Sequence, residues 1–205
     1  MEQRAESREQ NVLMVGYNRR FSPLARIIKE EFADGPMALI YRVNAGAIPR
    51  DSWIHDPEFG GGRIIGEVCH FVDTLTFLAG ALPVSVYANA MDDSNNLNDT
   101  LNIAFSYQNG SIGTISYLAN GDKSLPKERI EVFAHGATAI IDDFKELTVY
   151  SNGKKKRKKL FSQDKGQKEE VKQFVEAILN GTDTPAMWEK HKIRCSEFAT
   201  LEDTE

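Results

Sequence analysis

Cysteine is scarce in this chain: its 205 residues include two, Cys69 and Cys195, with no Cys-x-x-Cys pair. Two isolated cysteines make neither a disulfide framework nor a zinc-ligand pattern, and they fit a reduced, cytoplasmic setting. No apolar run reaches the roughly 20 residues that a membrane-spanning helix needs. The N-terminus, Met-Glu-Gln-Arg-Ala-Glu-Ser-Arg, has no apolar core and is no signal peptide. We therefore expect a cytoplasmic protein without a metal site or a membrane segment.

An excess of positive charge is also missing. The chain has 25 Lys and Arg against 30 Asp and Glu, which gives a formal net charge of -5. Because phosphate binding requires a basic surface, no nucleic-acid partner is expected. One segment departs from this balance, the run Lys-Lys-Lys-Arg-Lys-Lys at residues 154–159. It is either an anion-binding or nuclear-targeting patch or a solvated strand or loop, and the second interpretation is favoured.

What is present is ordinary globular composition, with 41% apolar and 27% charged residues. Apolar residues at helical and strand-like spacing predict the order strand, helix, strand, long loop, buried helix, about six strands and two helices. Helices are expected over residues 23–32, 64–79, 171–179 and 185–201, and strands over residues 12–17, 37–45, 84–90, 101–107, 111–118, 129–133, 137–141 and 147–150.

Consecutive hairpins predict an α+β fold with a mixed, largely antiparallel sheet and helices on one face. This single domain is expected to cover residues 12–205, behind a polar tail at residues 1–11. Asn109-Gly110 lies between two strand-like runs and predicts a type I′ hairpin. Ser22-Pro23 predicts the start of the first helix, with Ser22 as its N-cap.

The glycines at residues 60–62 and 66 give only a weak signal for dinucleotide binding, because a long loop and not a strand precedes them. More informative are Glu67, His70 and Asp73, which lie three residues apart on one predicted helix. Two interpretations stay open. Either these groups carry chemistry, or they form an internal network in which Asp73 holds His70.

Other candidates also have two interpretations. The adjacent residues Arg19 and Arg20 fit either a bound carboxylate or phosphate or a surface pair with Glu30 or Glu31. In the long loop at residues 46–62, Trp53 and His55 fit either stacking on a sugar or packing within the loop.

Several of these segments resemble the substrate-side domain of the Gfo/Idh/MocA oxidoreductases. The resemblance rests on Val15-Gly16-Tyr17-Asn18-Arg19-Arg20-Phe21-Ser22-Pro23, Trp53, Gly60-Gly61-Gly62 and His70-x-x-Asp73. It implies a glyceraldehyde-3-phosphate-dehydrogenase-like C-terminal domain that forms homo-oligomers through the open face of its sheet. It also implies an N-terminal Rossmann partner domain that binds NAD or NADP and carries a Glu-Lys-Pro lysine, and a carbohydrate-like small-molecule substrate.

By this resemblance, His70 matches the family histidine that handles the hydroxyl proton of the substrate. Glu67 is then expected to orient His70 or to bind a neighbouring hydroxyl, which makes these two the catalytic candidates. Tyr17, Arg20 and Trp53 are expected to line the substrate pocket, and Asp73 to be a structural partner.

The chain departs from the family pattern at two points. Gly66 stands where the family aspartate usually lies, four residues before the histidine, and Glu67 follows one position later. One residue along an α-helix turns a side chain by about 100°. This Gly-Glu-x-Cys-His motif is similar to the motif of a family branch in which the domain follows an alcohol-dehydrogenase-like module.

The second departure is that no Glu-Lys-Pro and no nucleotide fingerprint occur in the chain. We expect a substrate-binding domain that holds no cofactor tightly and is inactive alone. The alternative is a non-catalytic binding or assembly module that keeps the fold without the chemistry.

Overall fold

A computed structural model describes residues 13–32, 35–56, 58–92 and 97–182. Contacts divide the chain into two compact units, residues 17–167 and a second unit made of residues 1–16 with 168–205. The helix α3 (Gln167–Asn180), which belongs to the second unit from residue 168 on, confirms the helix predicted at residues 171–179. The last predicted helix, residues 185–201, lies outside the described residues.

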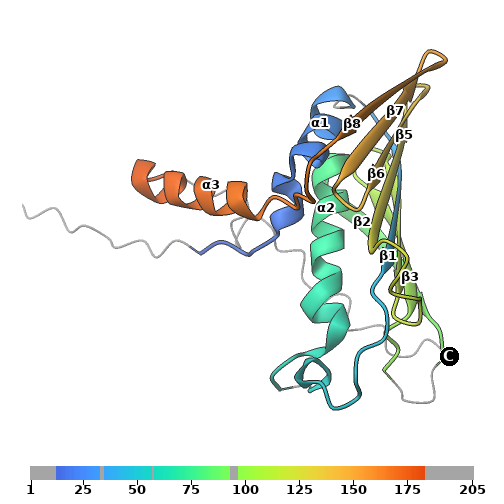
Figure 1. Cartoon of the computed structure of the whole chain (residues 1–205), viewed down its shortest axis with the longest axis vertical. Coiled ribbons are helices and arrows are strands. Elements are labelled where there is room, and N and C mark those ends of the chain that lie inside the picture. Colours follow the sequence, from blue (N-terminus) through green and yellow to red (C-terminus); the bar gives the residue numbers. More distant parts are fainter. Residues whose placement is uncertain (1–12, 33–34, 57, 93–96, 183–205) are drawn as a thin grey trace, which may run out of the picture. The chain divides into compact units, whose positions relative to one another are not determined.

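The larger unit is built on one eight-stranded sheet in the order β2-β3-β4-β1-β5-β6-β7-β8 (Figure 1). The strands are β1 (Ala38–Asn44), β2 (Pro83–Ala90), β3 (Leu101–Tyr107), β4 (Ile112–Leu118), β5 (Glu128–Ala134), β6 (Ala137–Asp142), β7 (Glu146–Ser151) and β8 (Lys154–Lys159). Only β1 and β4 run parallel, while every other neighbouring pair is antiparallel. The predicted mixed, largely antiparallel sheet is confirmed.

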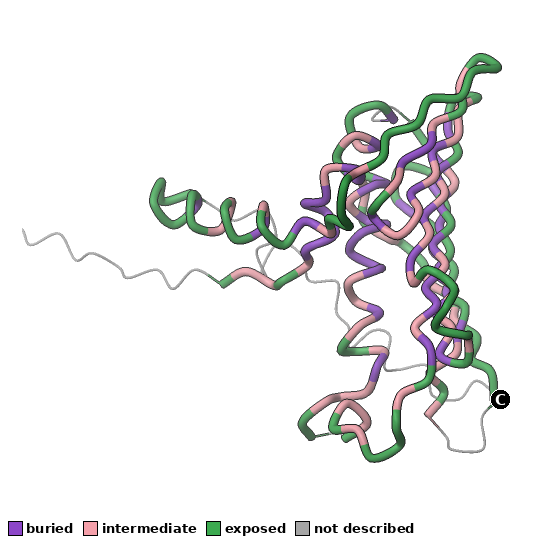
Figure 2. The backbone as a smooth tube through the Cα atoms, in the orientation of Figure 1, coloured by how far each residue is buried: buried purple, intermediate pink, exposed green. Residues whose placement is uncertain are grey.

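Two helices, α1 (Pro23–Glu31) and α2 (Cys69–Ala79), lie on one face of this sheet (Figure 1). A 3₁₀ turn at Asn18–Phe21 precedes α1, and a π-helical turn at Ile64–Val68 precedes α2. Period-two alternation turns Leu39, Tyr41 and Val43 of β1 toward the helices, where they are at most 1% exposed. Figure 2 shows the buried backbone gathered where α2 meets the sheet.

Within the larger unit, none of the described helices covers the other face of the sheet. The alternate residues on it include Ile40, Ile112, Phe133 and Tyr150, each of which is 39% exposed or more. None of the helices in the described part of the chain combines the length and the apolar character that crossing a bilayer requires.

Two local predictions are wrong, and a third is confirmed in part. Residues 13–17 form no strand, apart from an isolated bridge at Met14. Ser22 is the N-cap residue of α1, as predicted, but its hydroxyl donates to the carbonyl of Asp164 at 2.8 Å and makes no capping bond to the helix. In the β3–β4 turn only Gly110 has a positive φ, and the Asn109 amide donates to the carbonyl of Ala79 at 2.9 Å. The Asn109 side chain is thus used to cap the end of α2.

Type I′ geometry occurs instead in the β5–β6 and β7–β8 turns, where both central residues have positive φ. These are His135-Gly136 at 53° and 73°, and Asn152-Gly153 at 51° and 69°.

Candidate functional site

The two catalytic candidates lie on one continuous helical segment that begins directly after the three glycines. Glu67 belongs to the π turn, and His70 to the first turn of α2. A π turn takes one residue more than an α-helical turn and occurs frequently at functional sites. The α-helical geometry assumed from the sequence therefore does not give the direction of Glu67, whose carboxylate points to the sheet.

Two groups from the sheet side hold the Glu67 carboxylate. The Tyr117 hydroxyl, from β4, donates to Oε2 at 2.7 Å, and Nζ of Lys127, just before β5, lies 3.5 Å from the same oxygen. Burial acts to raise the pKa of Glu67, but the Tyr117 hydrogen bond and the charges of Lys127 and Arg63 outweigh it and lower the pKa. Glu67 is therefore an ionised hydrogen-bond acceptor at neutral pH.

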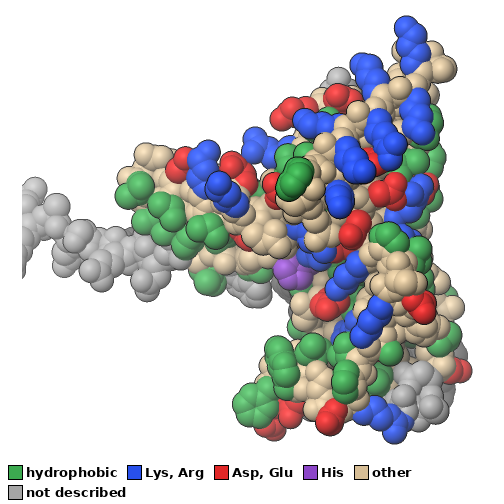
Figure 3. Space-filling model, viewed as in Figure 1, with side chains coloured by type: hydrophobic (Ala, Val, Ile, Leu, Met, Phe, Trp, Pro, Cys, Tyr) green, Lys and Arg blue, Asp and Glu red, His purple; other side chains and the backbone are tan. Residues whose placement is uncertain are grey.

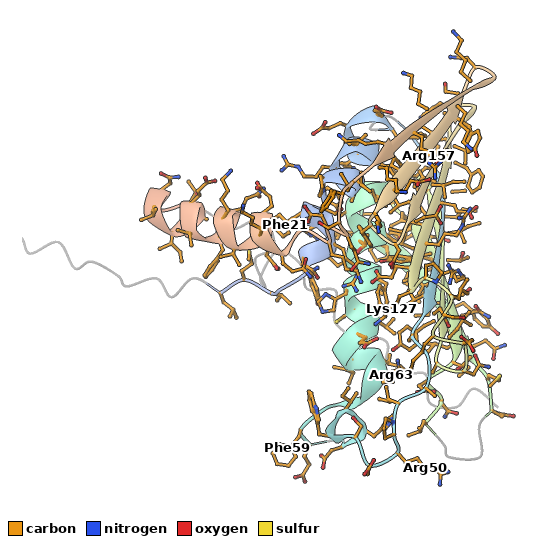
Figure 4. The ribbon with its side chains drawn as sticks, viewed as in Figure 1. Phe21, Arg50, Phe59, Arg63, Lys127 and Arg157 are labelled. Carbon is orange, nitrogen blue, oxygen red and sulfur yellow. The ribbon has the colours of Figure 1, made fainter. Side chains whose placement is uncertain are left out.

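Arg63 contacts the Tyr117 ring that holds Glu67. Its guanidinium is 2% exposed, donates to the carbonyl of Gly46 at 2.8 Å and lies 3.5 Å from Asp99. It also stacks 5.3 Å from the centroid of the Tyr117 ring, which restricts that ring. Figure 4 shows Arg63 and Lys127 beside the N-terminal half of the helical segment.

His70 is partly exposed, so its ring is not sealed in the interior. Its Nδ1 is buried and has no hydrogen-bond partner among the described residues. The Tyr17 ring meets it edge-on, with centroids 5.5 Å apart. Burial, helped by the positive charge of Arg19, lowers the pKa of His70 to about 4. The imidazole is thus neutral near pH 7, and it can accept a proton or a hydrogen bond.

Asp73 does not hold His70, so that interpretation is wrong. Asp73 forms a two-point ion pair with Arg20, in which Nε donates to Oδ2 at 2.9 Å and a second guanidinium nitrogen donates to Oδ1. The side chains are 8% and 2% exposed. The structural role expected of Asp73 fits this geometry, whereas direct contact of Arg20 with a substrate stays a prediction.

Arg19 is the centre of a second buried network. It donates to both carboxylate oxygens of Glu128, at 2.6 and 3.0 Å, and lies 4.7 Å from the centroid of the Phe71 ring. Glu128 also accepts from the Tyr41 hydroxyl at 2.5 Å and from Lys165 Nζ at 2.6 Å. Burial opposes ionisation, but these donors outweigh it and lower the pKa of Glu128 to about 2.

The interpretation of the two arginines as surface partners of Glu30 or Glu31 is therefore wrong. Sequence reasoning also missed Tyr117, Lys127 and Glu128. For Glu128 the sequence showed only a charged residue at the start of a strand, because its partner Arg19 lies 109 residues away along the chain.

Trp53 lies in a 3₁₀ turn, Trp53–His55, within the long loop. It is 69% exposed, and two other apolar side chains of this region, Phe59 and Ile65, are 81% and 54% exposed. Figure 4 shows Phe59 at the outer end of the loop. No described contact joins Trp53 to His70 or Glu67, so its role in substrate binding stays a prediction.

Two other features of the molecule involve none of these residues: the basic run at residues 154–159 and a hollow on the sheet. All six residues of β8 are exposed, and Figure 3 shows blue side chains along that edge of the sheet. The interpretation of the basic run as a solvated strand is confirmed. A hollow of about 610 Å³ lies at one end of the uncovered sheet face, lined by residues such as Met37, Phe133 and His135.

The glycines at residues 60–62 follow a 3₁₀ turn and open a π turn. In the described ranges, no glycine loop joins a strand directly to a helix, as a dinucleotide cradle requires. The described residues therefore do not fit a bound NAD or NADP.

Comparisons with known proteins place this geometry in context. A family model described as the GFO/IDH/MocA C-terminal domain matches residues 37–140, which is 104 of the 205 residues. A comparison with curated proteins gave no match.

Solved structures are similar over more of the chain. A dehydrogenase from Clostridium difficile is 18% identical with a TM-score of 0.71, and the match covers 87% of this chain and 57% of that one. For UDP-N-acetylglucosamine 3-dehydrogenase from Acidithiobacillus ferrooxidans the identity is 21%, the TM-score 0.72, and the shares 86% and 55%. For aldose-aldose oxidoreductase from Caulobacter crescentus, complexed with glycerol, they are 18%, 0.68, 86% and 56%. At these identities the likeness shows the fold, and this chain spans little more than half of each of those proteins.

Proposed function

The chain belongs to the GFO/IDH/MocA family, and we propose that it is the substrate-binding domain of an NAD- or NADP-dependent oxidoreductase of sugars, polyols or nucleotide sugars. The observation that carries the proposal is that one helical segment presents a neutral imidazole and an ionised carboxylate. His70 is partly exposed and neutral, and Glu67 three residues earlier is half-buried and ionised. The names of two similar structures, a nucleotide-sugar dehydrogenase and an aldose oxidoreductase, support the substrate class.

In this proposal His70 handles the hydroxyl proton. A neutral imidazole at the reacting carbon can accept that proton, or hold the hydroxyl in place for another base. Its low pKa makes protonation before substrate binding rare at pH 7. The nicotinamide of NAD or NADP supplies hydride acceptance, and it is bound by a separate N-terminal Rossmann domain.

The remaining predicted residues position the substrate. Glu67 orients His70 or binds a neighbouring hydroxyl, and Tyr17, whose ring meets His70, borders the same space. Arg20 and Trp53 are retained as pocket residues, Arg20 through its buried pair with Asp73 and Trp53 through its exposed ring in the long loop.

The uncovered sheet face is proposed as the homo-oligomer interface. It carries Ile40, Ile112, Phe133 and Tyr150 in one surface-exposed set. Contiguous exposed apolar area of this kind marks interaction sites in proteins. A reduced, cytoplasmic location is also part of the proposal, and it rests on the low cysteine content.

The test uses the parent polypeptide that joins this chain to a Rossmann domain. Purified protein is screened for reduction of NAD and NADP with sugars, polyols and nucleotide sugars. With an active substrate, His70→Gln should lower kcat/KM by at least about a hundredfold, the usual contribution of one acid–base group. His135→Asn, in an exposed turn with positive φ, is the matched control and should leave kcat/KM unchanged. Normal turnover by the His70 variant would defeat the assignment.

One observation favours the alternative of a non-catalytic binding or assembly module. Gly66 has no side chain where the family aspartate usually lies, and it is exposed. In that case the parent protein would bind a sugar saturably and reduce neither cofactor, and His70→Gln would weaken that binding without affecting any turnover.

A further inference from the structure

Lys127, which the predicted site did not include, forms a partly exposed ion pair with Glu67. Their side chains are 37% and 33% exposed, and 3.5 Å separates Lys127 Nζ from Glu67 Oε2. The backbone before β5 is held in place because the backbone N–H of Asn44 donates to the backbone carbonyl of Lys127 at 2.7 Å. The position of Lys127 is therefore set by the sheet, while its ammonium group reaches the helical segment.

Hydrogen-bonding capacity is left over on both partners. Both bonds to Glu67 end on Oε2, so among the described residues Oε1 accepts none. A lysine ammonium has three donors, and the described contacts of Lys127 use one. The pair therefore presents one acceptor and two donors at a partly open surface.

A hydroxyl group satisfies such a pair, because it donates to the carboxylate oxygen and accepts from the ammonium at the same time. A carbonyl offers no donor, and a deoxy carbon offers neither function. An anionic group would be attracted by Lys127 but repelled by Glu67. The chemistry of the pair thus selects a neutral hydroxyl over a carboxylate or phosphate.

The pair also lies close to the reacting centre that the proposed function places at His70. Glu67 and His70 are only three residues apart along one helical segment. The charges of Glu67 and Lys127 both act on the His70 ring. A hydroxyl bound at the pair is therefore attached close to the carbon whose hydroxyl meets His70.

Tyr117 keeps the carboxylate oriented. Its hydroxyl donates to Glu67, and burial raises the pKa of Tyr117, so that it stays a donor at all physiological pH values. The Arg63 guanidinium over its ring restricts the ring further. Tyr117 does not need to touch the substrate to have this effect.

We propose that Lys127 and Glu67 read a hydroxyl on the carbon next to the one that is oxidised, and that Tyr117 is the residue that positions Glu67. This inference rests on the proposed function. It identifies the substrate as a vicinal diol, such as a polyol or a sugar with a free hydroxyl beside the reacting carbon. Lys127 is then a specificity-determining residue of this domain.

The experiment measures discrimination between a diol and its deoxy analogue in the parent enzyme. The probes are D-glucose, myo-inositol and UDP-N-acetylglucosamine, each with analogues that lack one ring hydroxyl. Wild type should prefer the full diol by about tenfold or more in kcat/KM, the effect of one hydrogen bond to a charged group. Lys127→Met should bring that ratio to within about twofold, mainly through a higher KM for the diol.

Further variants separate recognition from folding. Lys127→Arg keeps a cationic donor and should restore most of the preference. Lys145→Met removes an exposed lysine from the β6–β7 turn and should change nothing. Tyr117→Phe removes a hydrogen bond that lowers the pKa of Glu67, so the acidic limb of the pH profile should move to higher pH.

The possible outcomes test the inference and the proposed function separately. If the enzyme oxidises one of the probes and Lys127→Met discriminates as wild type does, the inference is overturned and the proposed function stands. If none of the probes reduces NAD or NADP or binds saturably, the proposed function is overturned, and the inference with it.

Discussion

Glu128 provides the sharpest test of the physical reasoning, because one buried carboxylate ties together four donors. Two come from Arg19, one from Tyr41 and one from Lys165, and the Glu128 side chain is 0% exposed. The perturbation is Glu128→Gln, which keeps the shape but removes the charge. Breaking a buried ion pair from one side costs about 3 to 5 kcal/mol at neutral pH, because the cations stay buried without a counter-charge.

The same carboxylate predicts a pH dependence of known sign. Its pKa is lowered from 4.5 to about 2 in the folded chain. A lowered carboxyl pKa stabilises the fold above the unfolded value, and this stabilisation is lost as pH falls through the folded value. A carboxyl pKa lowered this far corresponds to about 3 kcal/mol of stability, which is lost between about pH 5 and pH 2.

The assay is urea unfolding followed by tryptophan fluorescence at a series of pH values from 6 down to 2, with linear extrapolation to water. The quantity compared is the difference in the free energy of unfolding between wild type and Glu128→Gln. Other titrating groups are common to both proteins and cancel. This difference should shrink by about 3 kcal/mol on going from pH 6 to pH 2.

A matched control is Glu146→Gln, which removes a carboxylate from the surface pair with Arg157. Exposed pairs contribute little, so the pH dependence of this variant should follow that of wild type. If the difference between wild type and Glu128→Gln stays constant from pH 6 to pH 2, the buried network does not hold Glu128 ionised and the reasoning is refuted.

Three further predictions concern the imidazole, the core and the uncovered face. In an NMR titration the His70 ring should titrate near pH 4, well below the usual 6.5, and a midpoint above 6 would contradict the burial argument. Leu75→Ala, at a position that is 0% exposed, should lower the free energy of unfolding by about 2 to 5 kcal/mol. Leu82→Ala, at a position 44% exposed, should stay within about 0.5 kcal/mol in the same urea melts. Phe133→Lys should shift the parent protein to smaller species in sedimentation velocity, and an unchanged distribution would show that oligomers form elsewhere.

Local sequence patterns predicted most of the secondary structure of the sheet and helices. Period-two alternation along residues 101–107 and 112–118 is read directly as strands, because successive side chains of a strand point to opposite faces. The Pro23 start and the Gly80 end of two helices follow from the backbone angles those residues prefer. The motif around Arg19-Arg20 and the motif around His70, taken together, indicated the family, which the family model confirms.

Local patterns failed where a side chain had a distant partner. Asn109-Gly110 was expected to form a type I′ turn, but the Asn109 side-chain amide donates to the carbonyl of Ala79 at the end of α2. Ser22 stands at the predicted N-cap position, but its hydroxyl donates to a carbonyl 142 residues away and not to its own helix. Neighbouring residues in the chain hold no information about these competing acceptors. The same limit explains why the sequence did not indicate Glu128 and Asp73 as the partners of Arg19 and Arg20.

The sequence alone thus determined most of the strands and helices, and it named His70 as the candidate for the chemistry, a role that stays a prediction. Only the tertiary structure decided that Glu67 meets Tyr117 and Lys127, which are 50 and 60 residues away along the chain. Only the tertiary structure shows that Arg19 is held by Glu128. The physical reason is that backbone propensities act over a few residues, whereas burial and hydrogen bonding act wherever the folded sheet brings distant side chains together.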